Sequence, residues 1–171
     1  PQRANTPEYE LTLKLATSEM RDFVLDMPLF SSLSSLEIGL QKGSALNCGS
    51  EYKHKKPIVF YGSSITHGAC ASRPGLCYEA IISRRLDTDF VNLGFSGGAK
   101  GEDTVMTYIA GLDMSMFVYD YDYNAPSAEH LMATHYKGYR KVRDSHPDIP
   151  IIMASSPNFS NPARDGKARR D

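Results

Sequence analysis

The sequence has few cysteines, and this limits the kind of fold it can form. Three cysteines among 171 residues are too few for a disulfide framework and leave at least one thiol unpaired. Their spacing fits no zinc-binding pattern. Cys70 and Cys77 flank a turn at residues 74 and 75, so a bridge between them is conceivable in an oxidising compartment. Buried free thiols are the commoner arrangement, and we expect free cysteines here.

Net charge and long apolar runs are also missing. The 19 basic and 20 acidic residues nearly cancel, so no overall field favours nucleic acid or an anionic membrane as a partner. No apolar run approaches the roughly 18 residues that a membrane span needs. The chain starts at Pro1 without a signal-like segment, which suggests a processed chain or a piece of a longer protein and leaves its compartment open.

The first part of the chain, residues 1–52, has the pattern of β-structure. Apolar and polar residues alternate over residues 9–15 and again over residues 36–40, with a third strand-like run at residues 23–25. A sheet of two or three strands is marginal by itself. We therefore interpret residues 1–52 as a β-rich N-terminal segment, the remnant of a larger β-sandwich module.

From residue 53 to residue 160 the pattern changes to alternating strands and helices. Apolar runs predict strands near residues 58–61, 90–93, 116–121 and 149–153. Residues at helical spacing predict helices near 78–86, 105–112 and 126–145. This alternation is typical of an α/β domain whose parallel sheet is flanked by helices. The polar residues 161–171 are expected to form a mobile tail.

The ends of the predicted strands carry residues suited to acyl transfer. Reactive groups in such sheets gather at the carboxyl ends of the strands. Candidates there are Ser64 after the first strand, Ser96 and Gly97 after the second, Asn124 after the third, and Ser155, Ser156 and Asn158 after the fourth. We predict that Ser64 attacks a carbonyl while the amides of Ser64 and Gly97 and the side chain of Asn124 form an oxyanion hole. Taken alone, the segment 62–66 is more typical of a simple turn and helix cap, and it is the spacing of the later strand ends that favours the catalytic interpretation.

The same segments carry a family resemblance. Residues 62–66 (GSSIT) resemble the G-D-S-[LI] block of GDSL/SGNH hydrolases, with Ser63 in place of aspartate. Residues 92–97 are similar to the second block, whose glycine helps form the oxyanion hole, and Asn124 is similar to the asparagine of the third. The resemblance covers about residues 56–159, and the fourth block, D-x-x-H, is absent.

The resemblance implies a flavodoxin-like three-layer α/β domain and ester hydrolysis through an acyl-serine, without cofactor. It favours short acyl or acetyl groups on carbohydrates or similar small esters as substrates, because some family members carry a β-sandwich before the hydrolase domain. Tyr121 and Tyr123 are most simply packing residues, and the alternative is that one of them stacks on a sugar face. An extracellular or periplasmic location is also implied.

Two other kinds of site are disfavoured. The glycine-rich residues 94–101 lack both the Gly-Lys-Ser/Thr ending of a phosphate loop and the G-x-G-x-x-G spacing, and they follow the second predicted strand rather than the first. Asp120 and Asp122 form one acidic pair, whereas a hard cation requires about six oxygen ligands. We expect no metal.

The general base is missing from the pattern. The chain has five histidines, and two of them, His54 and His146, precede predicted strands and belong at the opposite sheet edge. His135 is expected to pack on an apolar helix face, and His130 belongs to no motif. His67 is a candidate substitute base, although its position so close to Ser64 in sequence is unfavourable. We therefore expect this chain alone to be nearly inactive; the alternative is a catalytically silent domain that binds an acyl or glycan ligand.

Overall fold

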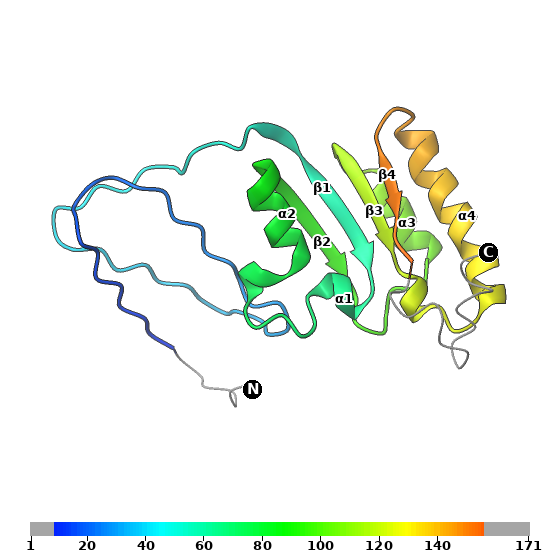
Figure 1. Ribbon diagram of the computed structural model, residues 1–171, viewed down its shortest axis with the longest axis horizontal. Coiled ribbons are helices and arrows are strands. Elements are labelled where there is room, and N and C mark those ends of the chain that lie inside the picture. The colour runs from blue at the N-terminus through cyan, green and yellow to red at the C-terminus, as the bar shows by residue number, and fades with distance from the viewer. Residues whose placement is uncertain (1–8, 156–171) are drawn as a thin grey trace.

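A computed structural model describes residues 9–155, and its centre is a parallel sheet with the strand order β2-β1-β3-β4 (Figure 1). The strands are β1 (His54–Gly62), β2 (Thr88–Gly94), β3 (Met116–Asp120) and β4 (Ile151–Met153). The helices are α1 (Ser64–His67), α2 (Tyr78–Leu86), α3 (Asp103–Ala110) and α4 (Ala128–Ser145), with short 3₁₀ turns η1 (Pro74–Leu76) and η2 (Asp122–Asn124). The predicted α/β domain with helices around a parallel sheet is confirmed.

The central strand β1 shows why the sheet has helices on both faces. Residues along a strand point alternately to opposite faces. Ile58 and Phe60 pack with Tyr78 and Ile82 of α2, whereas Val59 and Tyr61 belong to the larger core that α3 and α4 cover. A nearly continuous apolar strand is the pattern expected when both faces are buried.

The strand order brings the ends of three strands to one edge of the sheet, where a crevice is expected in sheets of this kind. The chain runs from β1 through α2 to its neighbour β2, then crosses by α3 to β3 on the other side of β1. Such a reversal leaves an opening at the carboxyl ends of the strands on either side of it. Gly62 of β1 pairs with Gly94 of β2 and with Asp120 of β3, so the three strands end level with one another and present their following loops together.

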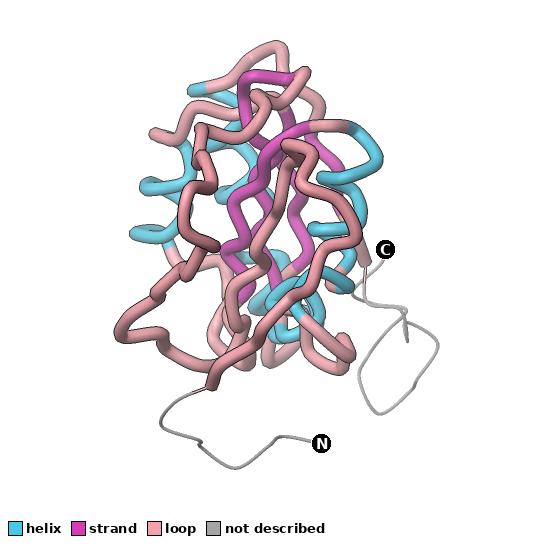
Figure 2. The backbone as a smooth tube through the Cα atoms, turned by 90° about the vertical axis from the view of Figure 1, so that its left-hand side faces the viewer, coloured by secondary structure: helices cyan, strands magenta, loops and turns pink. Residues whose placement is uncertain are grey.

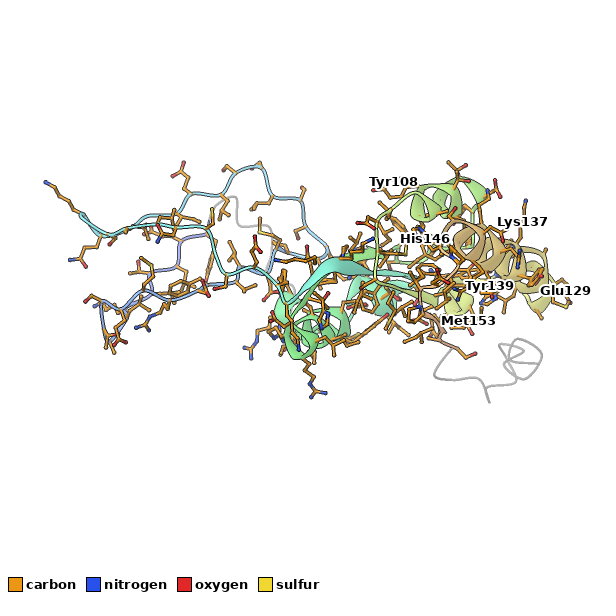
Figure 3. The ribbon with its side chains drawn as sticks, turned by 90° about the horizontal axis from the view of Figure 1, so that it is seen from above. Tyr108, Glu129, Lys137, Tyr139, His146 and Met153 are labelled. Atoms are coloured by element: carbon orange, nitrogen blue, oxygen red, sulfur yellow. The ribbon has the colours of Figure 1, made fainter. Side chains whose placement is uncertain are left out.

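The N-terminal arm, residues 9–53, corrects one prediction. The strands expected at residues 9–15, 23–25 and 36–40 are not formed, and the whole arm is loop (Figure 2). Strands need hydrogen-bonding partners. Most of the arm extends away from the sheet domain with its side chains spread around it (Figures 1 and 3), and it returns to contact α1 at Leu29 and Phe30. Leu11 and Leu13 are each 65% exposed and Phe23 is 63% exposed, so neither face of the expected strands is covered.

The interpretation of residues 1–52 as the remnant of a β-sandwich stays a prediction, as does the boundary near residue 160, and the tail at residues 161–171 lies outside the described residues.

Cys48, Cys70 and Cys77 are free, as expected, and Cys77 is buried. Within residues 9–155, no helix combines the length and the apolar character that crossing a bilayer would require.

Candidate active site

The turn from β1 into α1 presents one accessible serine. A Cβ at Gly62 would lie 2.1 Å from Thr66 Oγ1 and 2.5 Å from the Asp120 carbonyl oxygen, so only glycine fits this bend. Ser63 is fully buried, and its Oγ accepts a hydrogen bond from the Ile65 N–H at 3.2 Å, which makes it the N-cap of α1. Ser64 is the first residue of α1 and is only half-buried. Of the two adjacent serines, Ser64 is the one that a substrate can reach.

The loop after β2 lies against this turn. The Phe95 N–H donates to the Gly62 carbonyl at 2.9 Å, and the Gly98 and Ala99 amides both donate to the Phe95 carbonyl, at 2.9 and 3.1 Å. Gly97 has a φ of +71° and is exposed, and its amide donates to no backbone carbonyl within residues 9–155. A backbone N–H group in a tight turn that donates to no backbone carbonyl is suited to bind a developing negative charge.

Asn124 joins the third strand end to the same place. It closes η2, just after β3, and its Nδ2 donates to the Phe95 carbonyl at 3.0 Å. Hydrogen bonds through Gly62, Phe95 and Asn124 therefore connect the loops that carry the predicted nucleophile and both predicted donors. Ser64 itself has no hydrogen bond to Gly97 or Asn124 among the described residues. Of the candidates after β4, Ser155 is exposed, and Ser156 and Asn158 lie outside the described residues.

All five histidines fall within the described residues. Their hydrogen bonds and ring contacts are to residues other than Ser64. His67 Nε2 lies 2.5 Å from the Leu29 carbonyl oxygen, and its ring stacks on Phe30 at 3.9 Å between centroids. His130 Nε2 lies 2.8 Å from the Lys100 carbonyl oxygen.

The other three histidines are no better placed. His135 stacks on Tyr119 and Tyr121, as its predicted packing role requires. His146 contacts the Ala110 carbonyl and lies at the opposite end of α4 from Glu129 (Figure 3), and His54 begins β1. No histidine has a hydrogen bond or a ring contact to Ser64 among the described residues.

A buried polar network beneath α1 was not recognised in the sequence. The Asp120 carboxylate Oδ2 accepts hydrogen bonds from Thr66 Oγ1 at 3.1 Å and from the Tyr78 hydroxyl at 3.4 Å, and these two hydroxyls lie 3.2 Å apart. Burial raises the pKa of Asp120 to about 6, although the Thr66 hydrogen bond acts in the opposite direction. Thr66, Tyr78 and Asp120 come from different elements, and no spacing along the chain indicates that they meet.

Two further residues near α1 were also missed. The Asn92 side chain donates to the Thr66 carbonyl at 2.7 Å and accepts from the Gly94 N–H at 2.8 Å, which ties the end of α1 to β2. Glu79 in the first turn of α2 is fully buried, and burial raises the pKa of its carboxyl to about 7. Asn92 was visible only as part of the resemblance at residues 92–97, and Glu79 carried no signal.

The structure places the tyrosines and the acidic pair near the strand ends. Tyr121 is only 1% exposed, lies in the core cluster and has its hydroxyl 2.7 Å from Thr134 Oγ1, so its expected packing role is confirmed and the alternative of stacking on a sugar is excluded. Tyr123 is half-buried, and its role stays a prediction. Asp120 ends β3 and Asp122 begins η2; among residues 9–155 they are not part of any cluster of three or more potential metal ligands.

Known proteins share the sequence pattern and the fold of this chain. The model of the GDSL-like lipase/acylhydrolase family matches residues 55–170. The chain is also similar to a crystal structure described as a GDSL-like lipase from Bacteroides ovatus ATCC 8483, with 37% sequence identity and a TM-score of 0.74 over 83% of this chain and 43% of that one. The match covers 83% of this chain, which is more than residues 54–171 alone could supply. The match therefore includes part of the N-terminal arm.

Two more distant structures share the fold. The salicylyl-acyltransferase SsfX3 from a tetracycline biosynthetic pathway has 22% identity and a TM-score of 0.58, over 69% of this chain and 37% of that one. A two-domain esterase (CEX) active on acetylated mannans has 24% identity and a TM-score of 0.53, over 67% of this chain and 33% of that one. The chain thus spans less than half the length of each of these proteins, and no curated protein matches it.

Proposed function

Because the chain belongs to the GDSL-like lipase/acylhydrolase family, we propose that it carries the nucleophile and oxyanion hole of a serine ester hydrolase. In this proposal Ser64 Oγ attacks the ester carbonyl as a base takes its proton. The tetrahedral intermediate then collapses, the alcohol leaves with a proton, and an acyl-serine remains for water to hydrolyse. The observation that carries the proposal is the meeting of three strand-end loops through the Gly62, Phe95 and Asn124 hydrogen bonds.

The oxyanion would be bound by the Ser64 and Gly97 amides and by the Asn124 side chain. The Asn124 Nδ2 uses one of its two hydrogens on Phe95 and retains the other for the substrate. Loss of one such donor typically costs about 3 kcal/mol of transition-state stabilisation. This chemistry requires no cofactor, since the charge is held by amide groups alone.

The base, in our proposal, comes from residues that this sequence does not contain. None of the five histidines contacts Ser64, and residues 156–171 contain no histidine. The chain covers 43% of the Bacteroides ovatus relative, so much of a longer relative has no counterpart here. The 171-residue chain alone should therefore be nearly inactive.

For the substrate, we propose a short acyl group, such as acetyl, on a carbohydrate hydroxyl or a similar small ester. The support is the fold shared with an esterase active on acetylated mannans, together with the half-buried Tyr123 next to Asn124 at the crevice. An aromatic ring in that position offers a face on which a sugar can stack.

A fluorophosphonate probe tests the nucleophile. We expect it to label the full-length protein that contains this chain at Ser64, and Ser64→Ala to abolish labelling without unfolding the protein. Ser63→Ala is the matched control: it removes the helix cap at a cost of about 1 kcal/mol in stability but should still be labelled. Labelling that persists in Ser64→Ala would refute the assignment.

An esterase assay tests the missing base. We expect hydrolysis of an acetyl ester by the full-length protein and almost none by the 171-residue chain. Full activity in the short chain would mean that one of its own histidines is the base. No hydrolysis by either, combined with tight binding of an acylated sugar, would favour the alternative of a silent binding domain.

A further inference from the structure

The helix that carries Ser64 is too short to hold its own shape. α1 has four residues, and isolated helices of this length are not stable in water. The orientation of Ser64 must therefore be imposed by contacts between α1 and the rest of the domain. Each end of α1 has a backbone anchor: the Ser63 N–H donates to the Asp120 carbonyl at 3.1 Å, and the Thr66 carbonyl accepts from the Asn92 side chain at 2.7 Å.

The middle of α1 is anchored by a side chain. Thr66 is fully buried, two residues after Ser64, and its hydroxyl donates to the Asp120 carboxylate at 3.1 Å. The Tyr78 hydroxyl of α2 donates to the same carboxylate oxygen at 3.4 Å and lies 3.2 Å from Thr66 Oγ1. Asp120 is 7% exposed. A carboxyl group buried at this depth is costly, and its hydrogen bonds are to α1 and to the helix that covers the sheet beside it.

We propose that Asp120 is a positioning residue for the nucleophile, which through Thr66 and Tyr78 holds α1 so that Ser64 faces the loops bearing Gly97 and Asn124. This inference rests on the proposed function, because it takes Ser64 to be the nucleophile. Asp120 contacts α1 twice, by its backbone carbonyl and by its carboxylate. The end of β3 and the start of α1 are thereby held as one unit.

The groups around the Asp120 carboxylate include no positive charge that would stabilise its ionised form. Tyr78 and Glu79 from α2 and Asp122 from η2 face it, and none of these groups is a cation. Its attraction to α1 therefore depends on the Thr66 and Tyr78 hydroxyls rather than on an ion pair. Removing one hydroxyl should loosen α1 without creating a large cavity.

Thr66→Val is the sharpest test, because it removes the hydroxyl and keeps the side-chain shape. In the full-length protein we expect the second-order rate constant for fluorophosphonate labelling of Ser64 to fall about 10-fold or more, the loss typical of a displaced catalytic group. Thr66→Ser should restore the rate. Asp120→Asn exchanges the carboxylate for an amide, and we expect it to lower the labelling rate as well.

Thr88→Val is the matched control. Thr88 is 2% exposed, and its hydroxyl donates to the Lys56 carbonyl at 3.3 Å at the start of β2, the opposite edge of the sheet. This variant should lower the urea midpoint by an amount similar to Thr66→Val and leave the labelling rate unchanged. Equal labelling of wild type and Thr66→Val, or equal losses in Thr66→Val and Thr88→Val, would overturn the proposal.

Amide hydrogen exchange separates this inference from the proposed function. The His67 and Gly68 amides donate within α1, to Ser63 and Ile65. If the wild-type protein is not labelled at all, the proposed function fails, and faster exchange of these two amides in Thr66→Val still supports Asp120 as the group that holds α1. Unchanged exchange would overturn the positioning role.

Discussion

The buried Glu79 should make the protein less stable as the pH rises. Its carboxyl lies in the first turn of α2 and is fully buried, and neither of its oxygens has a hydrogen-bond partner among the described residues. Burial, with a smaller contribution from the Asp120 carboxylate, raises its pKa from 4.5 to about 7. A carboxylic acid in this position is better tolerated protonated than charged.

The sign and size of the effect follow from proton linkage. The unfolded chain releases the Glu79 proton near pH 4.5, whereas the folded protein retains it up to about pH 7. The folded state therefore binds more protons between these values, and its stability falls as the pH rises through them. At about 1.4 kcal/mol per pKa unit, a shift from 4.5 to about 7 destabilises the folded protein by about 3 kcal/mol at pH 8.

Glu79→Gln isolates this contribution, because glutamine copies the protonated acid. We expect the free energy of unfolding of Glu79→Gln to match that of wild type at pH 4 and to exceed it by about 3 kcal/mol at pH 8, which corresponds to about 1.5 M in urea midpoint for an m value of about 2 kcal/mol/M. Glu37→Gln, on the exposed arm, should follow wild type at every pH. Urea unfolding at pH 4, 6 and 8 measures all three.

The result that would refute the reasoning is equally definite. If Glu79→Gln and wild type run parallel from pH 4 to pH 8, or if the variant is less stable at pH 8, the carboxylate must be well compensated in the folded state. A shallower slope that remains in Glu79→Gln is expected from Asp120, whose pKa is also raised by burial, to about 6.

Three further predictions follow from the site. Asn124→Ala should lower kcat on an acetyl ester about 10²-fold with little change in KM, since its amide acts when the oxyanion forms; a change in KM alone would make it a binding residue. Gly94→Ala should lower stability by about 3 kcal/mol or more in a thermal melt, because the new Cβ would lie 2.1 Å from the His67 backbone nitrogen. Gly111→Ala, whose Cβ would have no atom nearer than 3.5 Å, is the tolerated control. His67→Ala should keep esterase activity within about twofold in the full-length protein, and a loss of about 10²-fold or more would identify His67 as the base.

Local sequence was sufficient for the sheet domain. The apolar runs predicted at residues 58–61, 90–93 and 116–121 form strands, the last ending at Asp120, because a chain buried on both faces requires continuous apolar residues. The order of strands and helices then requires parallel pairing. The sequence alone therefore predicts that the strand ends carrying Ser64, Gly97 and Asn124 lie at one edge of the sheet.

The N-terminal arm shows the limit of the same method. Residues 9–15 and 36–40 alternate as strands do, yet they form none in the structure. Alternation reports which side chains suit a half-buried sheet, but a strand exists only when another strand accepts its hydrogen bonds. The alternation of apolar and polar residues within one segment does not show whether such a partner strand is present.

The sequence by itself determined which residues the chain brings to the crevice, because strand ends and glycine turns are local properties. Only the tertiary structure decided how they are held. Thr66, Tyr78 and Asp120 are separated by 12 and 42 residues along the chain and meet only because α1, α2 and β3 pack together. The same packing buries Ser63 as a cap and turns His67 toward the arm. Contacts between distant segments depend on three-dimensional packing, and one-dimensional spacing does not encode them.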